Sequence, residues 1–115
     1  MLLFSIFGCA TPADRQKAAS STLDAHARDY WEFLMRENPT WATYIGDYRY
    51  NDKLADIGPE GRSRAHEANV KFLERLRSID PRSLGDEEQI TWDIFRLRLE
   101  MDLEEERYKF WQWGV

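Results

Sequence analysis

The sequence predicts an all-α protein, an antiparallel bundle of about four helices that is part of a larger helical protein. Apolar side chains recur at intervals of three and four residues, which is the spacing of one face of an α-helix and not of a strand. Proline and glycine stand where these runs begin and end. At 115 residues the chain has room for one domain, and its 43% hydrophobic and 14% aromatic content is too high for a disordered chain.

The first helix is expected to begin near residue 21, after a signal-like segment over residues 1–9 and a polar tether over residues 10–20. Ser20, Ser21 and Thr22 can cap its first turn, because their side-chain oxygens accept hydrogen bonds from free backbone N–H groups. Its expected apolar face consists of Leu23, Ala27, Tyr30, Trp31 and Leu34. The sequence therefore divides into a leader, a tether and a helical region over residues 21–115.

Proline and glycine also mark the boundaries that follow. Asn38-Pro39 is expected to end the first helix, since proline disfavours helical backbone in the residue before it. Pro39 can in turn open a short second helix, and Gly46 suits the left-handed position at the end of that helix. We expect an ordered loop over residues 47–58 after it.

Two longer helices complete the predicted bundle. One begins at Pro59 and is closed by Asp80-Pro81, and its apolar positions are Ala65, Phe72, Leu73, Leu76 and Ile79. A turn over residues 80–86 follows. The last helix runs from about Asp86 to beyond Tyr108.

The last helix carries two apolar stripes instead of one. The first stripe consists of Ile90, Ile94, Leu97, Met101 and Tyr108, and the second of Trp92, Phe95, Leu99, Leu103 and Phe110. A helix at the surface of a small bundle needs only one such stripe, so two predict neighbours on both sides. Together with the aromatic end over residues 110–113, this pattern predicts a chain cut from a larger domain, or one that packs against a protein partner.

The N-terminus resembles a bacterial export signal. Residues 1–9 form an uncharged apolar run, and Ile6-Phe7-Gly8-Cys9 is similar to a lipobox, in which the cysteine becomes the first mature residue and carries the lipid. This predicts lipid attachment at Cys9, a membrane contact through that lipid, and a place in the bacterial cell envelope, in the periplasm. The alternatives are a buried free cysteine on an apolar N-terminal element, and a cytoplasmic protein whose start is not processed.

The charge of the chain limits the classes of molecule that it is expected to bind. The net charge is −5 and the isoelectric point is near 5.0, and every basic stretch is interleaved with acidic residues. A nucleic-acid surface needs clustered cations, so nucleic acid is not an expected partner.

The sequence offers no credible catalytic or metal site. His66-Glu67 would begin a zinc-peptidase helix, but the second histidine is replaced by Val70. His26 lies near Asp24 and Asp29, and we interpret it as part of a solvated helix face. We likewise interpret the acidic residues of the last helix as a solvated face. No catalytic residue, no metal ligand and no cofactor is therefore assigned to these residues.

Aromatic residues gather around Asn38-Pro39. They are Tyr30, Trp31, Trp41, Tyr44, Tyr48 and Tyr50. We interpret them first as a local core that joins the two helices and the loop. The second interpretation is one wall of a substrate cleft, where rings and hydroxyls orient a ligand.

Several of these motifs, taken in order, resemble a known family. Residues 31–52, with Asn38-Pro39, Ala42-Thr43 and Gly46, are similar to the opening of the domain-of-unknown-function 885 family. Residues 76–81 and 86–94 match further motifs, so that the resemblance covers roughly residues 23–110. Members are largely helical bacterial proteins, many of them exported lipoproteins.

That resemblance implies an activity located outside these residues. Members are several times longer, and they resemble zinc metallopeptidases through a His-Glu-x-x-His helix in their C-terminal part. The full-length protein would then bind Zn²⁺ through two histidines and an acid, with a glutamate that activates water. We expect this chain to be the helical scaffold of such an exported hydrolase. The alternative is a complete lipid-anchored interaction module without enzymatic activity.

Overall fold

Four α-helices and two short 3-10 turns make up the part of the chain that the computed structural model describes, residues 10–109 and 112. The helices are α1 (Pro12–Glu37), α2 (Pro39–Tyr44), α3 (Pro59–Arg77) and α4 (Asp86–Tyr108), and the turns are η1 (Tyr48–Tyr50) and η2 (Pro81–Ser83). No strand occurs in the described residues, which confirms the predicted all-α class.

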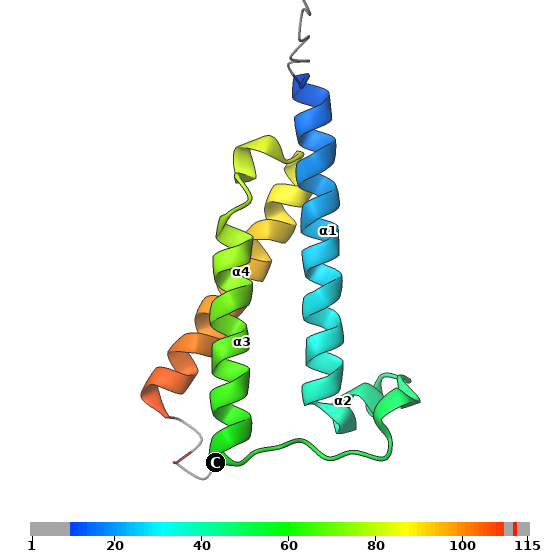
Figure 1. Cartoon of the computed structure of the whole chain (residues 1–115), viewed down its shortest axis with the longest axis vertical. Helices are drawn as coiled ribbons and strands as arrows, with labels where there is room; N and C mark the ends of the chain where they lie inside the picture. The colour runs from blue at the N-terminus through cyan, green and yellow to red at the C-terminus, as the bar shows by residue number, and fades with distance from the viewer. Residues whose placement is uncertain (1–9, 110–111, 113–115) are drawn as a thin grey trace, which may run out of the picture.

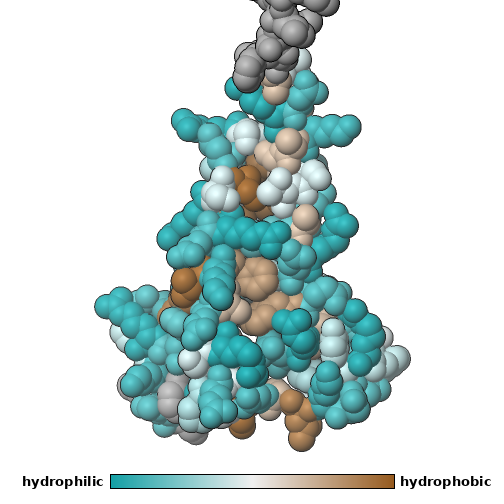
Figure 2. Space-filling view, viewed as in Figure 1, coloured by the Kyte–Doolittle hydropathy of each residue, from teal (hydrophilic) through white to brown (hydrophobic). Residues whose placement is uncertain are grey.

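The three long helices pack against one another. Figure 1 shows α1 and α3 running in opposite directions, with the connection from α2 to α3 passing beneath them. α4 crosses behind α3, and it contacts both α3 and α1. In Figure 2 hydrophilic residues cover most of this face, and apolar side chains show along the seam between the helices.

Helix α1 begins earlier than the sequence prediction placed it. Thr11 Oγ1 accepts a hydrogen bond from the N–H of Asp14 at 3.1 Å, and Asp14 Oδ2 accepts one from the N–H of Thr11 at 3.2 Å. These two bonds form a capping box ahead of Pro12, the first helical residue. The prediction of a tether over residues 10–20 and a cap at Ser20–Thr22 was therefore wrong from Pro12 onward. The small residues there include alanine, which favours helix most strongly.

The other helix boundaries follow the predicted prolines and glycine. α1 ends at Glu37 and is capped by Asn38, whose N–H donates to the carbonyl oxygen of Leu34 at 3.0 Å. Gly46 has a φ of 95°, the left-handed conformation predicted for it. Each of α1, α2, α3 and η2 has a proline in its first turn. The predicted loop over residues 47–58 contains the η1 turn.

The core lies where α1, α3 and α4 meet. Its buried members include Leu23, Tyr30, Phe33, Leu73, Leu76, Ile79, Leu84, Phe95 and Leu99. The Nε1–H of Trp92 donates to the carbonyl oxygen of Leu76 at 3.0 Å and ties α4 to the end of α3. The predicted face of α3 is confirmed, since Leu73 and Leu76 are buried, and Ile79, just beyond the end of the helix, is buried as well.

On α1 the buried face differs from the predicted one. Trp31 is 46% exposed, while Phe33 and Met35 are buried. The helix has apolar residues on more than one side, and the spacing alone did not show which side faces α3. Leu23 and Tyr30 are buried as predicted.

His26 belongs to the core and not to a solvated face, so that interpretation was wrong. Its side chain is fully buried between the rings of Phe72 and Phe95, with ring centres 5.4 and 5.1 Å away. The Nε2 atom lies 2.8 Å from the carbonyl oxygen of Phe72, which assigns the ring proton to Nε2. Nδ1 has no hydrogen-bond partner among the described residues. Burial lowers the pKa of His26, because an imidazolium ion would lose its hydration there.

This burial predicts a loss of stability in mild acid. The folded protein resists protonating His26, whereas the unfolded chain takes up that proton near the ordinary pKa of 6.5. The free energy of unfolding should therefore be highest above pH 6.5 and fall as the pH drops toward 5. Arg75 opposes the proton and Asp29 favours it more weakly.

Urea denaturation followed by tryptophan fluorescence at a series of pH values measures this dependence. His26→Gln keeps a donor for the Phe72 carbonyl and should flatten the curve between pH 7 and 5. The matched variant His66→Gln changes an exposed histidine on α3 and should leave the slope intact. An unchanged slope in His26→Gln would contradict this account.

Candidate functional site

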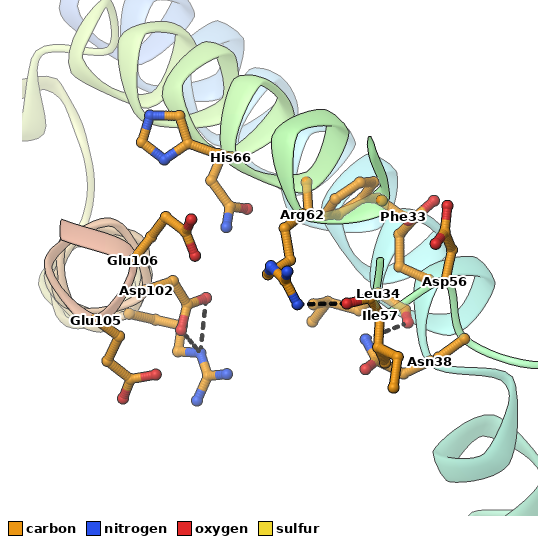
Figure 3. A pocket seen from close by; sticks show the side chains of 16 residues that line it. Phe33, Leu34, Asn38, Asp56, Ile57, Arg62, His66, Asp102, Glu105 and Glu106 are labelled. Atoms are coloured by element: carbon orange, nitrogen blue, oxygen red, sulfur yellow. Dashed lines mark hydrogen bonds and ion pairs between the residues drawn. The ribbon is translucent and has the colours of Figure 1, made fainter. Parts of the chain in front are cut away.

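The helices diverge toward the C-terminal ends of α1 and α4 and the N-terminal end of α3, at the bottom of Figure 1. They leave an open cleft of about 440 Å³ there. Phe33 and Leu34 of α1 and Ala65 of α3 provide its apolar lining. The loop residues Asp56 and Ile57 close one side. Figure 3 shows that side chains from α3 and α4 face each other across this space. The cleft brings together polar groups from α1, the loop before α3, α3 and α4.

Asp102 of α4 is held by two donors. The hydroxyl of Tyr30 donates to Asp102 Oδ2 at 3.2 Å, and Nε of Arg98 donates to the same oxygen at 3.2 Å. Burial raises the pKa of Tyr30 to about 12, and the negative charge of Asp102 adds to this effect. Tyr30 therefore stays protonated as a donor, and it connects α1 to α4 at the edge of the cleft.

The remaining polar groups of the cleft are mostly acceptors. Glu105 and Glu106 of α4 line it and form no ion pair within the described part of the chain, and Oδ1 of Asn69 is buried without a hydrogen-bond partner there. Arg62 donates to the carbonyl oxygen of Ile57. Since both arginines of the lining are engaged with the protein, the free groups suit a ligand rich in donors or positive charge.

The sequence prediction missed this cleft. It treated the acidic residues of the last helix as a solvated face, and Glu105 is indeed exposed. The spacing of Arg98 and Asp102, four residues apart on one helix, was the only signal of their pairing. Nothing in the spacing shows that Tyr30, 72 positions away, completes the arrangement.

The zinc ion that the resemblance implies does not fit these residues. His66 and the carboxylates of α4 line the same cleft, but within residues 10–109 and 112 no group of three His, Cys, Asp or Glu side chains could hold a metal. No step of a zinc reaction is derived from them. His66 itself is exposed on α3, as the sequence indicated.

The aromatic residues predicted to gather around Asn38-Pro39 separate into three places. Tyr30 is buried in the core. Trp31 of α1 contacts Trp41 of α2 edge to face, with ring centres 5.7 Å apart, and joins these helices. Trp41 and Tyr44 share a shallow pocket of about 410 Å³.

The other two tyrosines lie on η1. Tyr48 is exposed, and the ring of Tyr50 is flanked by Arg49 and Lys53. None of the six aromatic side chains lines the cleft between α1, α3 and α4. Among the six, Trp31 and Trp41 join α1 to α2, whereas Tyr44 and Tyr48 are exposed. No single pocket of the described chain contains all six residues.

The second stripe of α4 is buried and the first is not. Phe95 and Leu99 are buried, and Trp92 and Leu103 pack against the core. All five residues of the first stripe are more than half exposed: Tyr108 at 53%, and the four aliphatic or thioether residues Ile90 at 61%, Ile94 at 64%, Leu97 at 54% and Met101 at 51%. We call Ile90, Ile94, Leu97 and Met101 the outer stripe. The described residues supply a neighbour for only one of the two predicted sides.

Two predictions concern residues at the chain ends. Cys9, the predicted lipid attachment site, and the aromatic residues Phe110, Trp111 and Trp113 lie outside the described residues. Among the helices that are described, none is long and apolar enough to cross a membrane.

One comparison with known proteins gave a match. A family model described as "Bacterial protein of unknown function (DUF885)" matches residues 39–114. The match covers α2, α3 and α4 and begins just after α1. No curated protein and no solved structure matches the chain.

Proposed function

The chain belongs to the DUF885 family of bacterial proteins, and from this premise we propose that it is the helical scaffold of a larger, exported, zinc-dependent peptidase-like protein. In this proposal the catalytic groups lie outside these residues. The chain contributes a preformed surface on which the rest of the protein, or a partner, assembles.

The outer stripe of α4 carries the proposal. Large apolar side chains at four successive positions of one helix face are rarely left in water, because burying each of them is worth about 1.5–3 kcal/mol. Ile90, Ile94, Leu97 and Met101 are all more than half exposed, although the opposite face of the same helix is packed. A helix with one packed face and one exposed apolar face is suited to lie between two layers of a larger structure.

The chemistry of the cleft favours the same conclusion. Its Asp102 is bonded to Arg98 within α4 and to Tyr30 of α1, and the bond from Tyr30 holds α1 against α4. These two bonds fix the position of Asp102 and, through Tyr30, the position of α1 relative to α4. The cleft therefore supports a structural role for this part of the protein.

The proposal also includes a lipid anchor at Cys9, which would hold the protein to a membrane of the bacterial cell envelope. Its support is the sequence alone: the only cysteine follows the uncharged apolar run of residues 1–8. Mass spectrometry of the protein recovered from membranes of its host would find acyl groups on an N-terminal Cys9. A chain that retains Met1 and carries no lipid would contradict the anchor.

The scaffold itself is tested by comparing two products of the same gene. Ile94→Ser combined with Leu97→Ser should change the stability of the 115-residue chain by less than about 0.5 kcal/mol, because both side chains are exposed. In the product of the complete natural reading frame the same pair should cost about 2–4 kcal/mol, since a partner layer would then bury them.

A small effect in both products would contradict the scaffold proposal. Zinc content of the longer product, measured by atomic emission, tests the peptidase-like part separately.

A reading frame that ends after Val115 would instead favour the alternative, a complete lipid-anchored interaction module. For that alternative the outer stripe is again the feature in its favour, as the surface for a separate protein.

A further inference from the structure

The charges around the outer stripe indicate what covers it. We propose that the occupant is an amphipathic helix whose apolar face is bordered by lysine or arginine side chains. This inference rests on the proposed function, because it names the partner of the surface on which that function depends.

Carboxylates border the outer stripe on both sides. Asp93 and Glu104 lie along one side and Glu87 and Glu105 along the other, three or four positions from stripe residues, which makes them neighbours on the helix surface. All four are exposed. Within the described residues Glu87 and Glu105 form no ion pair, and Asp93 and Glu104 have only loose ones, to Arg96 at 3.6 Å and Arg107 at 3.5 Å. Cations on a partner would find these groups available.

Negative charge is concentrated on this helix. α4 contains nine carboxylates and three arginines, a surplus of six, whereas the net charge of the whole chain is −5. Of the three arginines, Arg98 is bonded to Asp102 and Arg96 to Glu100 at 2.9 Å. A helix that approaches the outer stripe therefore meets an acidic border, which favours basic residues at its own edges.

A groove beside the stripe gives the partner helix a point of attachment. Ala27 and Tyr30 of α1 and Ile94 and Phe95 of α4 line a pocket of about 280 Å³, with Arg98 at its edge. Ile94 belongs both to this groove and to the outer stripe. A large apolar side chain of the partner can insert there, as anchor residues do at interface centres.

A second copy of the chain fits this surface poorly. Two α4 helices packed stripe against stripe would place the same acidic borders opposite each other, and like charges at an interface oppose association. Anionic lipid headgroups would meet the same repulsion. A partner of opposite charge is therefore the occupant that the surface selects.

The test uses two synthetic peptides as long as α4, each with leucine at the spacing of the outer stripe. One has lysine along both borders and its twin has glutamate. Fluorescence anisotropy with the 115-residue chain should show the lysine peptide binding about tenfold or more tightly, a difference that shrinks as salt rises. Ile94→Ser with Leu97→Ser should abolish binding of the lysine peptide.

Matched charge reversals separate recognition from general attraction to an acidic protein. Asp93→Lys with Glu105→Lys should reverse the preference between the peptides. Glu67→Lys with Glu74→Lys makes the same change in net charge at exposed positions of α3 and should preserve the preference.

Three results would overturn the inference. They are equal affinity for both peptides, equal loss of preference in both charge-reversed variants, and a dimer of this chain that dissociates when Ile94 is replaced by serine. These failures are distinct from failure of the scaffold proposal. If the stripe substitutions destabilise the complete gene product but the peptides show no charge preference, the scaffold stands and the basic partner is rejected.

Discussion

Replacing Leu99 by alanine should lower the free energy of unfolding by about 3 kcal/mol, one of the two largest losses that we expect from a single substitution. Leu99 is fully buried on the inner face of α4, where it packs in the core with Leu76 of α3 and residues of α1. Truncating such a side chain removes its burial energy and leaves a cavity that the surrounding helices fill only in part. Urea denaturation at neutral pH measures the loss.

Leu97 provides a matched control on the same helix. It is the same residue type two positions away, but 54% of it is exposed, whereas Leu99 has an exposure of 0%. Leu97→Ala should therefore change the stability of this chain by less than about 0.5 kcal/mol. If the two substitutions cost the same, the assignment of the inner and outer faces of α4 would be wrong.

Replacing Gly61 by alanine should cost about 2 kcal/mol, although alanine favours helix over glycine by about 1 kcal/mol. Gly61 is buried in the first turn of α3 beneath the loop that carries Asp56. A Cβ atom there would overlap the backbone oxygen of Asp56 and lie 2.8 Å from its Cβ. The loop must shift, and the hydrogen bond from the N–H of Gly58 to Asp56 Oδ1, now 3.1 Å long, would be strained.

Ser63→Ala is the control for this substitution. Ser63 is exposed two positions further along the helix, so alanine there should be neutral or slightly stabilising. Thermal and urea denaturation of both variants would separate helix propensity from the steric conflict. Stabilisation by Gly61→Ala would mean that the loop does not pack on α3 as described. Because Asp56 and Ile57 also close the cleft, the same variant would alter its shape.

Much of the fold could be predicted because its signals are local. Pro39 and Pro59 open helices, and Gly46 adopts the left-handed conformation that its position predicted. The start of α1 was equally local, since Thr11 and Asp14 form a capping box that can be recognised in the sequence. That error came from giving small polar residues more weight than the cap.

The candidate site could be predicted only in part. Two stripes on the last helix were visible from spacing, but spacing does not show which stripe faces the core, so Leu97 and Leu99 became distinguishable only in the structure. The cleft depends on the angles at which three helices diverge. His26 became a core residue because Phe72 and Phe95, both distant in sequence, enclose it. Such packing is set by tertiary contacts that helix periodicity does not encode.

The prolines that open the helices also affect stability through the unfolded chain, in which no native contact exists. The chain has four prolines, and Pro12, Pro39, Pro59 and Pro81 each occupy the first turn of a helical element. A proline ring fixes φ near the helical value and needs no partner for an N–H, so these positions fit the folded backbone without strain. In the unfolded chain the same rings remove conformations that folding would otherwise have to give up, worth about 0.4–1 kcal/mol at each site. Part of the stability of this protein is therefore a reduction in the entropy of its unfolded state.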